Sequence, residues 1–152
     1  MTITDMALHS GKRRKGRGRK GNAIMLNEMK APPKNELNSG EALGIICECF
    51  GIDPEKDKLA YEIFKEIMEA RKGEHGVRTI EITRKIHVTQ AAVVYHMNTF
   101  MRDGLIVKEG REYRLRGRNL DQTFDELEQD MLRRMKRMRE IAKRLDEEFF
   151  GF

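Results

Sequence analysis

The chain has 152 residues, a formal net charge of +5 and a charged fraction of 36%. This length is typical of one domain with extensions. The sequence contains no apolar run of the roughly 18 residues that a membrane span needs, and no secretory signal pattern. We therefore expect a cytoplasmic protein that has no membrane partner.

The net positive charge of the chain lies in an N-terminal tail. Residues 1–20 contain seven Lys and Arg residues and one acid, Asp5, whereas the rest of the chain is close to neutral. A tail of Arg, Lys and Gly is expected to be disordered alone and to bind phosphates of a polyanion. It resembles the extensions of ribosomal proteins, which implies ribosomal RNA as one such polyanion; a tail that only aids solubility is the alternative. The expected phosphate-binding residues are Lys12, Arg13, Arg14, Lys15, Arg17, Arg19 and Lys20.

Residues 22–37 are expected to form a linker, so that residues 1–37 are tail and linker together. Pro32-Pro33 stops any helix there. Four apolar residues just before it predict a short amphipathic turn that docks on the domain or on a partner. They are Ile24, Met25, Leu26 and Met29.

A domain is predicted over residues 38–118, and it begins with two helices. Asn38 and Glu41 fit a capping box at the start of the first helix, and Gly51 ends it. Asp53-Pro54 predicts a cap and a first-turn proline for the second helix. That helix has an apolar face that we expect in the core: Leu59, Ile63, Phe64, Ile67 and Met68.

Residues 77–118 predict a short strand, two helices around a tight turn, and a two-stranded hairpin. Thr89 is a good N-cap for the second of these helices, and Gly104 ends it because glycine enters the left-handed region at little cost. Gly110 supplies the turn of the hairpin. The helix after Thr89 has an apolar face that calls for burial: Ala92, Val93, Met97, Phe100 and Met101.

The run VTQAAVVYHMNTFMRDGLIVKEGREYRL is similar to the core of ArsR- and MarR-type winged-helix regulators. It shares with them a small polar cap at Thr89, an apolar residue after a mid-helix His at His96-Met97, and Gly104-Leu105-Ile106 at the entry to the wing. The resemblance implies a mainly α fold with a small β-hairpin wing (α+β), that is, a winged helix-turn-helix. It also implies a transcriptional regulator that binds DNA.

If the helix after Thr89 enters a major groove, five side chains are expected to face the bases. They are Gln90, Ala91, Val94, Tyr95 and Asn98. Gln and Asn can bind adenine with two hydrogen bonds, and Ala or Val can contact the thymine methyl group. Tyr95 could instead be half-buried. Arg102 is the only basic residue on this helix, but the hairpin offers five for phosphate contacts: Lys108, Arg111, Arg114, Arg116 and Arg118.

Residues 119–152 predict one long charged helix with an apolar seam that Arg134 interrupts. Such a narrow seam favours a homodimer through a parallel or an antiparallel coiled-coil pair. A helix folded back on its own domain is the alternative. The expected dimer interface is Leu120, Phe124, Leu127, Met131, Met138, Ile141 and Leu145. Beyond it, Phe149, Phe150 and Phe152 need a pocket.

No residue pattern predicts catalysis or a metal site. His9, His75, His87 and His96 are scattered, and Cys47 and Cys49 have no second pair, so we expect buried thiols, no metal and no cofactor. No nucleophile–base pair or phosphate loop is found, which argues against an enzyme.

Two functions fit these features. The first is the DNA-binding regulator that the resemblance implies, made dimeric by the seam of the C-terminal helix. The second is a ribosome-associated factor in translation regulation or dormancy, whose tail binds ribosomal RNA and whose domain docks on RNA or ribosomal proteins.

Overall fold

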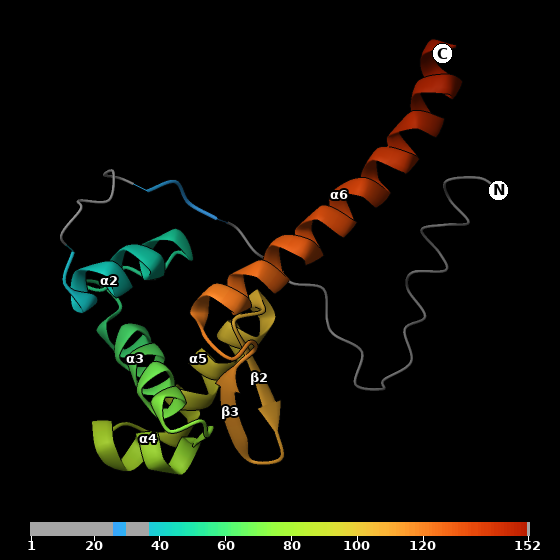
Figure 1. The fold of residues 1–152 in the computed structure, drawn as a ribbon. Coiled ribbons are helices and arrows are strands. Elements are labelled where there is room, and N and C mark those ends of the chain that lie inside the picture. The colour runs from blue at the N-terminus through green and yellow to red at the C-terminus, as the bar shows by residue number, and fades with distance from the viewer. Residues whose placement is uncertain (1–25, 30–36, 152) are drawn as a thin grey trace.

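The computed structural model describes residues 26–29 and 37–151. The fold is mainly helical, with a small three-stranded antiparallel sheet and a long C-terminal helix (Figure 1). The predicted tail residues 12–20 and the apolar residues Ile24 and Met25 lie outside the described part of the chain. Within that part, none of the helices combines the length and apolar composition that crossing a bilayer requires.

Two helices precede the sheet. Helix α2 spans Ser39–Cys49, and the Asn38 side chain accepts a hydrogen bond from the backbone N–H of Glu41 at 2.8 Å, which confirms the predicted N-cap. Helix α3 spans Lys58–Lys72. It begins later than predicted because Asp53 accepts from the N–H of Glu55 in a turn, and Asp57 is the residue that caps α3, through Ala60.

The sheet is built from three short strands in the order β1-β3-β2. They are β1 (Val77–Arg78), β2 (Ile106–Glu109) and β3 (Glu112–Leu115). Ile106 faces Leu115 across the hairpin, and Val77 faces Tyr113 across the other edge of β3. The predicted hairpin is therefore present, and the predicted first strand joins it.

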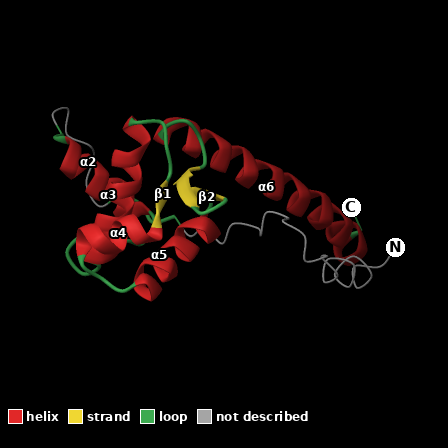
Figure 2. Cartoon of the chain, turned by 90° about the horizontal axis from the view of Figure 1, so that it is seen from below, coloured by secondary structure: helices red, strands yellow, loops and turns green. Residues whose placement is uncertain are grey.

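Helices α4 (Thr79–Ile86) and α5 (Gln90–Asp103) lie between β1 and β2 in sequence and pack against each other (Figure 2). His87 ends α4 in the left-handed region, with φ of 58°. Thr89 caps α5 by accepting from Ala92 N–H, and Gly104 ends it with φ of 82°. Both predicted ends of α5 are confirmed.

The core lies where α3, α4, α5 and the sheet meet. Phe64 of α3 and Phe100 of α5 make an edge-to-face contact with centroids 5.5 Å apart. Around this pair the apolar faces predicted for α3 and α5 are buried at Ile63, Ile67, Val93 and Met97, while Leu59, Met68 and Met101 are partly buried. Burial of these side chains supplies most of the favourable free energy of folding.

Helix α6 (Leu120–Phe150) begins against this domain and then leaves it. Thr123 is fully buried near the start of the helix, and its Oγ1 accepts from Gly117 N–H at 3.0 Å and donates to the carbonyl oxygen of Asn119 at 2.8 Å. Leu127 is also buried, and the Phe124 ring stacks on Phe50 at 5.6 Å. The second half of α6 projects away from the other elements (Figures 1 and 2).

Candidate nucleic-acid interface

The outward face of α5 carries the side chains predicted to face bases. Gln90, Ala91, Tyr95 and Asn98 are exposed, and Val94 is partly buried. The caps at Thr89 and Gly104 fix the length of α5, and burial of Val93, Met97 and Phe100 fixes its rotation. The five predicted residues therefore form one outward-facing stripe along α5.

Tyr95 is the most prominent side chain of this stripe. It is 69% exposed, so the alternative of a half-buried Tyr95 is wrong. Its ring contacts the ring of His96 edge-on, with centroids 5.2 Å apart. An exposed phenol held in this way can stack on a base or donate a hydrogen bond to a phosphate.

Gln90, in the first turn of α5, has a defined neighbour. Its Nε2 donates to Oγ1 of Thr79 at 3.4 Å, which links the first residue of α5 to the first residue of α4. Because this bond is long and exposed, the amide can exchange it for a stronger one to a ligand.

The hairpin that follows α5 presents exposed basic side chains. Lys108 and Arg111 flank the turn at Gly110, and Arg118 is exposed beyond β3. The Lys108 ammonium lies 5.3 Å from the centroid of the Tyr113 ring, a cation–π arrangement that positions it while leaving the charge in solvent. These three residues keep the predicted capacity to contact phosphates.

Arg114 is held inside the hairpin instead. Its guanidinium pairs with Glu109 on the neighbouring strand and donates to the carbonyl oxygens of Leu115 and Arg116, the former at 2.9 Å. The hydrogen bond from Arg114 lowers the pKa of the Glu109 carboxyl group. Arg114 therefore braces the hairpin, and much of its hydrogen-bonding capacity is already used.

Arg116 does not belong in the predicted phosphate-binding set. Its side chain is only 8% exposed, and it forms ion pairs with Glu126 at 2.8 Å and Asp130 at 2.6 Å, both on α6. A buried guanidinium neutralised by two carboxylates cannot reach a phosphate without breaking both pairs. Its function in the structure is to join β3 to α6.

The predicted dimer seam divides into two parts. Leu127 is only 4% exposed in the core of its own chain, and Leu120 and Phe124 pack against that core. The first third of α6 therefore folds back on its own domain, so these three residues pack within the chain, and their predicted contact with a second copy stays a prediction. Met131 and Met138 are exposed, and Ile141 and Leu145 are partly exposed.

Sequence reasoning missed a basic segment within α6. Residues 133–144 contain seven Lys and Arg residues and one Glu, whereas residues 121–130 contain five acids and no base. The charges of the two segments nearly cancel when net charge is summed over the chain after the tail, so the total concealed both segments. Counting charge in windows of about ten residues would have found the segment.

The cysteines and acidic residues do not form a metal site in the described ranges, where no group of three or more His, Cys, Asp or Glu side chains could hold an ion. Cys47 is buried, and burial together with the nearby Glu48 raises the pKa of its thiol to about 12. A thiol that stays protonated at neutral pH is a poor nucleophile and a poor metal ligand.

Comparison of the chain with protein-family models, with curated proteins and with solved structures found no match.

Proposed function

We propose that this chain is a winged-helix protein that binds nucleic acid in the cytoplasm, and that it acts as a dimeric DNA-binding transcriptional regulator. The observation that supports this best is the exposed stripe of α5, with Gln90 and Asn98 among its members, followed directly by a hairpin with exposed Lys108 and Arg111.

The order of elements supports the same proposal. A helix, a short strand, two helices around a tight turn and a hairpin follow one another from α3 to β3. In a winged helix of this order, the second helix of the pair enters the major groove and the hairpin contacts the backbone. On that basis α5 reads bases, while Lys108, Arg111 and Arg118 contact phosphates.

The few basic side chains of α5 indicate which bases this helix can recognise. Arg102, in the last turn, is its only basic residue, so no Arg is placed at the N-terminal end to bind guanine. Gln90 and Asn98 favour adenine, and Ala91 and Val94 favour thymine methyl groups. We therefore expect A·T-rich half-sites.

A footprint on duplex DNA tests this proposal. Genomic fragments selected by the full chain should share a protected A·T-rich site, and Gln90→Ala or Asn98→Ala should each weaken protection there by about tenfold, about the loss of one bidentate base contact. Gln129→Ala, at an exposed α6 position whose amide donates to Asp125 at 2.9 Å in its own helix, is the matched control and should leave the footprint unchanged. Equal protection of unrelated sequences by the wild-type chain would contradict sequence-specific readout.

The second candidate is the ribosome-associated factor, and the basic segment at residues 133–144 favours it. Together with the basic N-terminal tail, that segment gives RNA a second region of phosphate contact outside α5. Sedimentation of a lysate through sucrose separates the two candidates. Co-migration with ribosomal subunits that is lost at high salt, and weakened by deletion of residues 11–20, supports the ribosome; absence from those fractions supports the regulator.

A further inference from the structure

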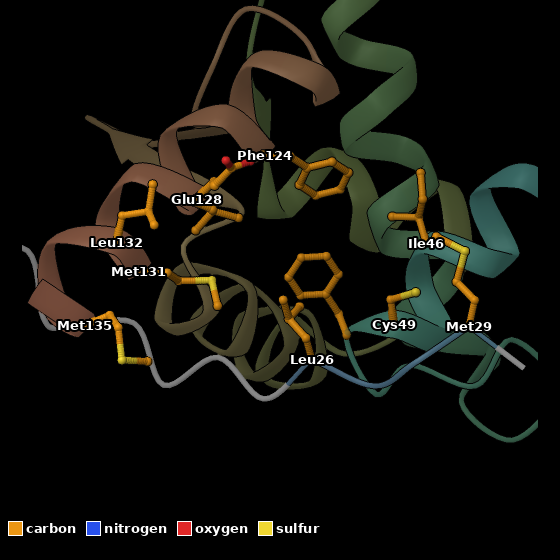
Figure 3. A pocket seen from close by; sticks show the side chains of 11 residues that line it. Leu26, Met29, Ile46, Cys49, Phe124, Glu128, Met131, Leu132 and Met135 are labelled. Carbon is orange, nitrogen blue, oxygen red and sulfur yellow. The ribbon is translucent and has the colours of Figure 1, made fainter.

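An apolar groove of about 550 Å³ lies beside the first half of α6 (Figure 3). Residues 26–29 form one wall, and they dock through a hydrogen bond from Asn27 N–H to the carbonyl oxygen of Cys49 at 2.8 Å. The described part of the predicted apolar anchor, residues 26–29, therefore docks on its own domain. Glu128 is the only charged residue of a lining that is otherwise apolar or sulfur-containing: Leu26, Met29, Ile46, Cys49, Phe50, Phe124, Leu127, Met131, Leu132 and Met135.

The apolar stripe of α6 continues past the groove into the projecting half. After Met131 it runs through Met135, Met138, Ala142, Leu145 and Phe149, at alternating spacings of four and three residues. Met138 is 62% exposed and Phe149 is 74% exposed. A stripe with this spacing is the face that a second helix covers in a coiled coil, and Met135 rather than Arg134 carries it across the gap noted in the sequence.

The groove and the projecting half of α6 match in length. The groove borders α6 from Phe124 to Met135, and the stripe beyond it runs from Met138 to Phe149. Each span covers eleven residue steps, or about 16 Å of helix. An antiparallel pair brings the second span of one chain onto the first span of another.

Charge selects the antiparallel direction. A parallel pair in register places the basic residues 133–144 of one helix beside the same residues of the other, where like charges repel. The antiparallel pair places Arg139 and Lys143 near Glu128, the only charge in the groove lining. Opposite charges then meet on both sides of the axis, and basic side chains face each other only at residues 133–137 rather than along the whole basic segment.

We propose that a second copy of this chain fills the groove, in an antiparallel pair of α6 helices with a two-fold axis near Met135. The proposal deepens, and rests on, the dimeric state proposed above. In this pair Met138 of the second copy lies opposite Leu132, and Phe149 of the second copy lies opposite Asp121, about one helical turn beyond Phe124 at the end of the groove. The interface is isologous, so both grooves and both projecting halves are covered at once.

The antiparallel pairing also determines the distance between the domains of the two copies. Asp125 lies ten residues before the axis, so the two Asp125 positions lie about 30 Å apart along the helices. The spacing of half-sites one DNA turn apart is about 34 Å. A parallel pair would instead set the domains side by side.

Cross-linking tests the direction of the pair. The full chain with Cys49→Ser receives Glu128→Cys and Ala142→Cys, two positions that the axis near Met135 brings opposite each other, and is treated with a short bis-maleimide. We expect a covalent dimer from this double variant and none from Ala142→Cys alone. A covalent dimer from Ala142→Cys alone means a parallel pair and overturns the proposal.

Light scattering and charge reversal separate failure of the pairing from failure of the proposed function. Wild-type chain should have twice the mass of one chain, and Leu132→Glu with Met138→Glu should be monomeric. Glu128→Arg should raise the dimer Kd at least tenfold, and adding Arg139→Glu and Lys143→Glu should return the Kd toward the wild-type value. A dimer Kd that these charge changes do not alter would reject the antiparallel pair but not the dimer. A wild-type monomer at all concentrations rejects the dimer, whereas nucleic-acid binding is judged by the footprint.

Discussion

Arg116 donates from Nη1 to Oδ2 of Asp130 at 2.6 Å, and this buried ion pair fastens the hairpin to α6. The same guanidinium also pairs with Glu126 at 2.8 Å. The angle at which α6 leaves the domain therefore depends on a side chain that the sequence alone assigned to nucleic-acid binding.

Replacing Arg116 should destabilise the fold. Arg116→Met keeps the aliphatic stem but leaves Glu126 and Asp130 without this partner, and breaking a buried pair costs about 3 kcal/mol. Arg118→Met, at an exposed position two residues on, should change the free energy of unfolding by less than about 0.5 kcal/mol. Chemical denaturation measures both. Equal stability of the two variants would show that the ion pairs of Arg116 do not hold α6.

The hydroxyl of Thr123 offers a second test of the joint between the hairpin and α6. Thr123→Val keeps the shape but leaves the buried Gly117 N–H without its acceptor, which should cost about 1–3 kcal/mol. Thr99→Val is the matched control, because its hydroxyl likewise donates to the carbonyl oxygen four residues earlier but accepts no such N–H. Thermal unfolding should place Thr99→Val close to wild type. A Thr123→Val variant as stable as Thr99→Val would contradict the account.

How much of the fold and of the candidate site could be predicted from the sequence depends on whether the interactions that determine each feature are local or long-range. The ends of α5 follow from Thr89 and Gly104 because caps are local. The start of α3 was misplaced because Asp53 and Asp57 are both plausible caps, and the turn that decides between them involves backbone atoms. Arg116 was misassigned because its partners are set by how α6 packs, which no local pattern encodes.

The groove was still harder to predict. Its wall at residues 26–29 is held by a backbone hydrogen bond to Cys49, twenty-two positions further on, and such pairing leaves little trace in residue type. The sequence did show the apolar residues Leu26 and Met29, but it did not decide between docking on the domain and docking on a partner.

Neutralising the hairpin should change the salt dependence of DNA binding. Lys108→Gln with Arg111→Gln removes two expected phosphate contacts, so the slope of log K against log salt should become less steep by about 1.8 on duplex DNA. Lys136→Gln with Arg137→Gln removes equal charge from the projecting half of α6 and should leave that slope nearly unchanged. Fluorescence anisotropy titrations over a range of salt concentrations measure it. If the α6 pair causes the larger change, the phosphates are bound by α6 rather than by the hairpin.

Because the Cys47 thiol is buried, the free energy of unfolding should fall at alkaline pH. Burial raises its thiol pKa from 9.0 to about 12, so the folded state holds the proton more tightly than the unfolded state. The stability this provides is fully present below pH 9 and is lost as pH rises from 9 toward 12. The difference in unfolding free energy between wild type and Cys47→Ala should therefore shrink between pH 8 and pH 10.5. Cys49→Ala serves as the control, and a difference for Cys47→Ala that does not vary with pH would contradict the assignment.

A photo-cross-linking side chain at Tyr95 would show whether the exposed stripe of α5 contacts DNA bases. Tyr95 is exposed and central to the stripe, so p-benzoylphenylalanine there should cross-link in cells to DNA fragments that share an A·T-rich site. The same group at Gln129 is the control and should give no such enrichment. Recovery of ribosomal RNA from the Tyr95 position, or of no nucleic acid at all, would contradict contact between this stripe and DNA bases.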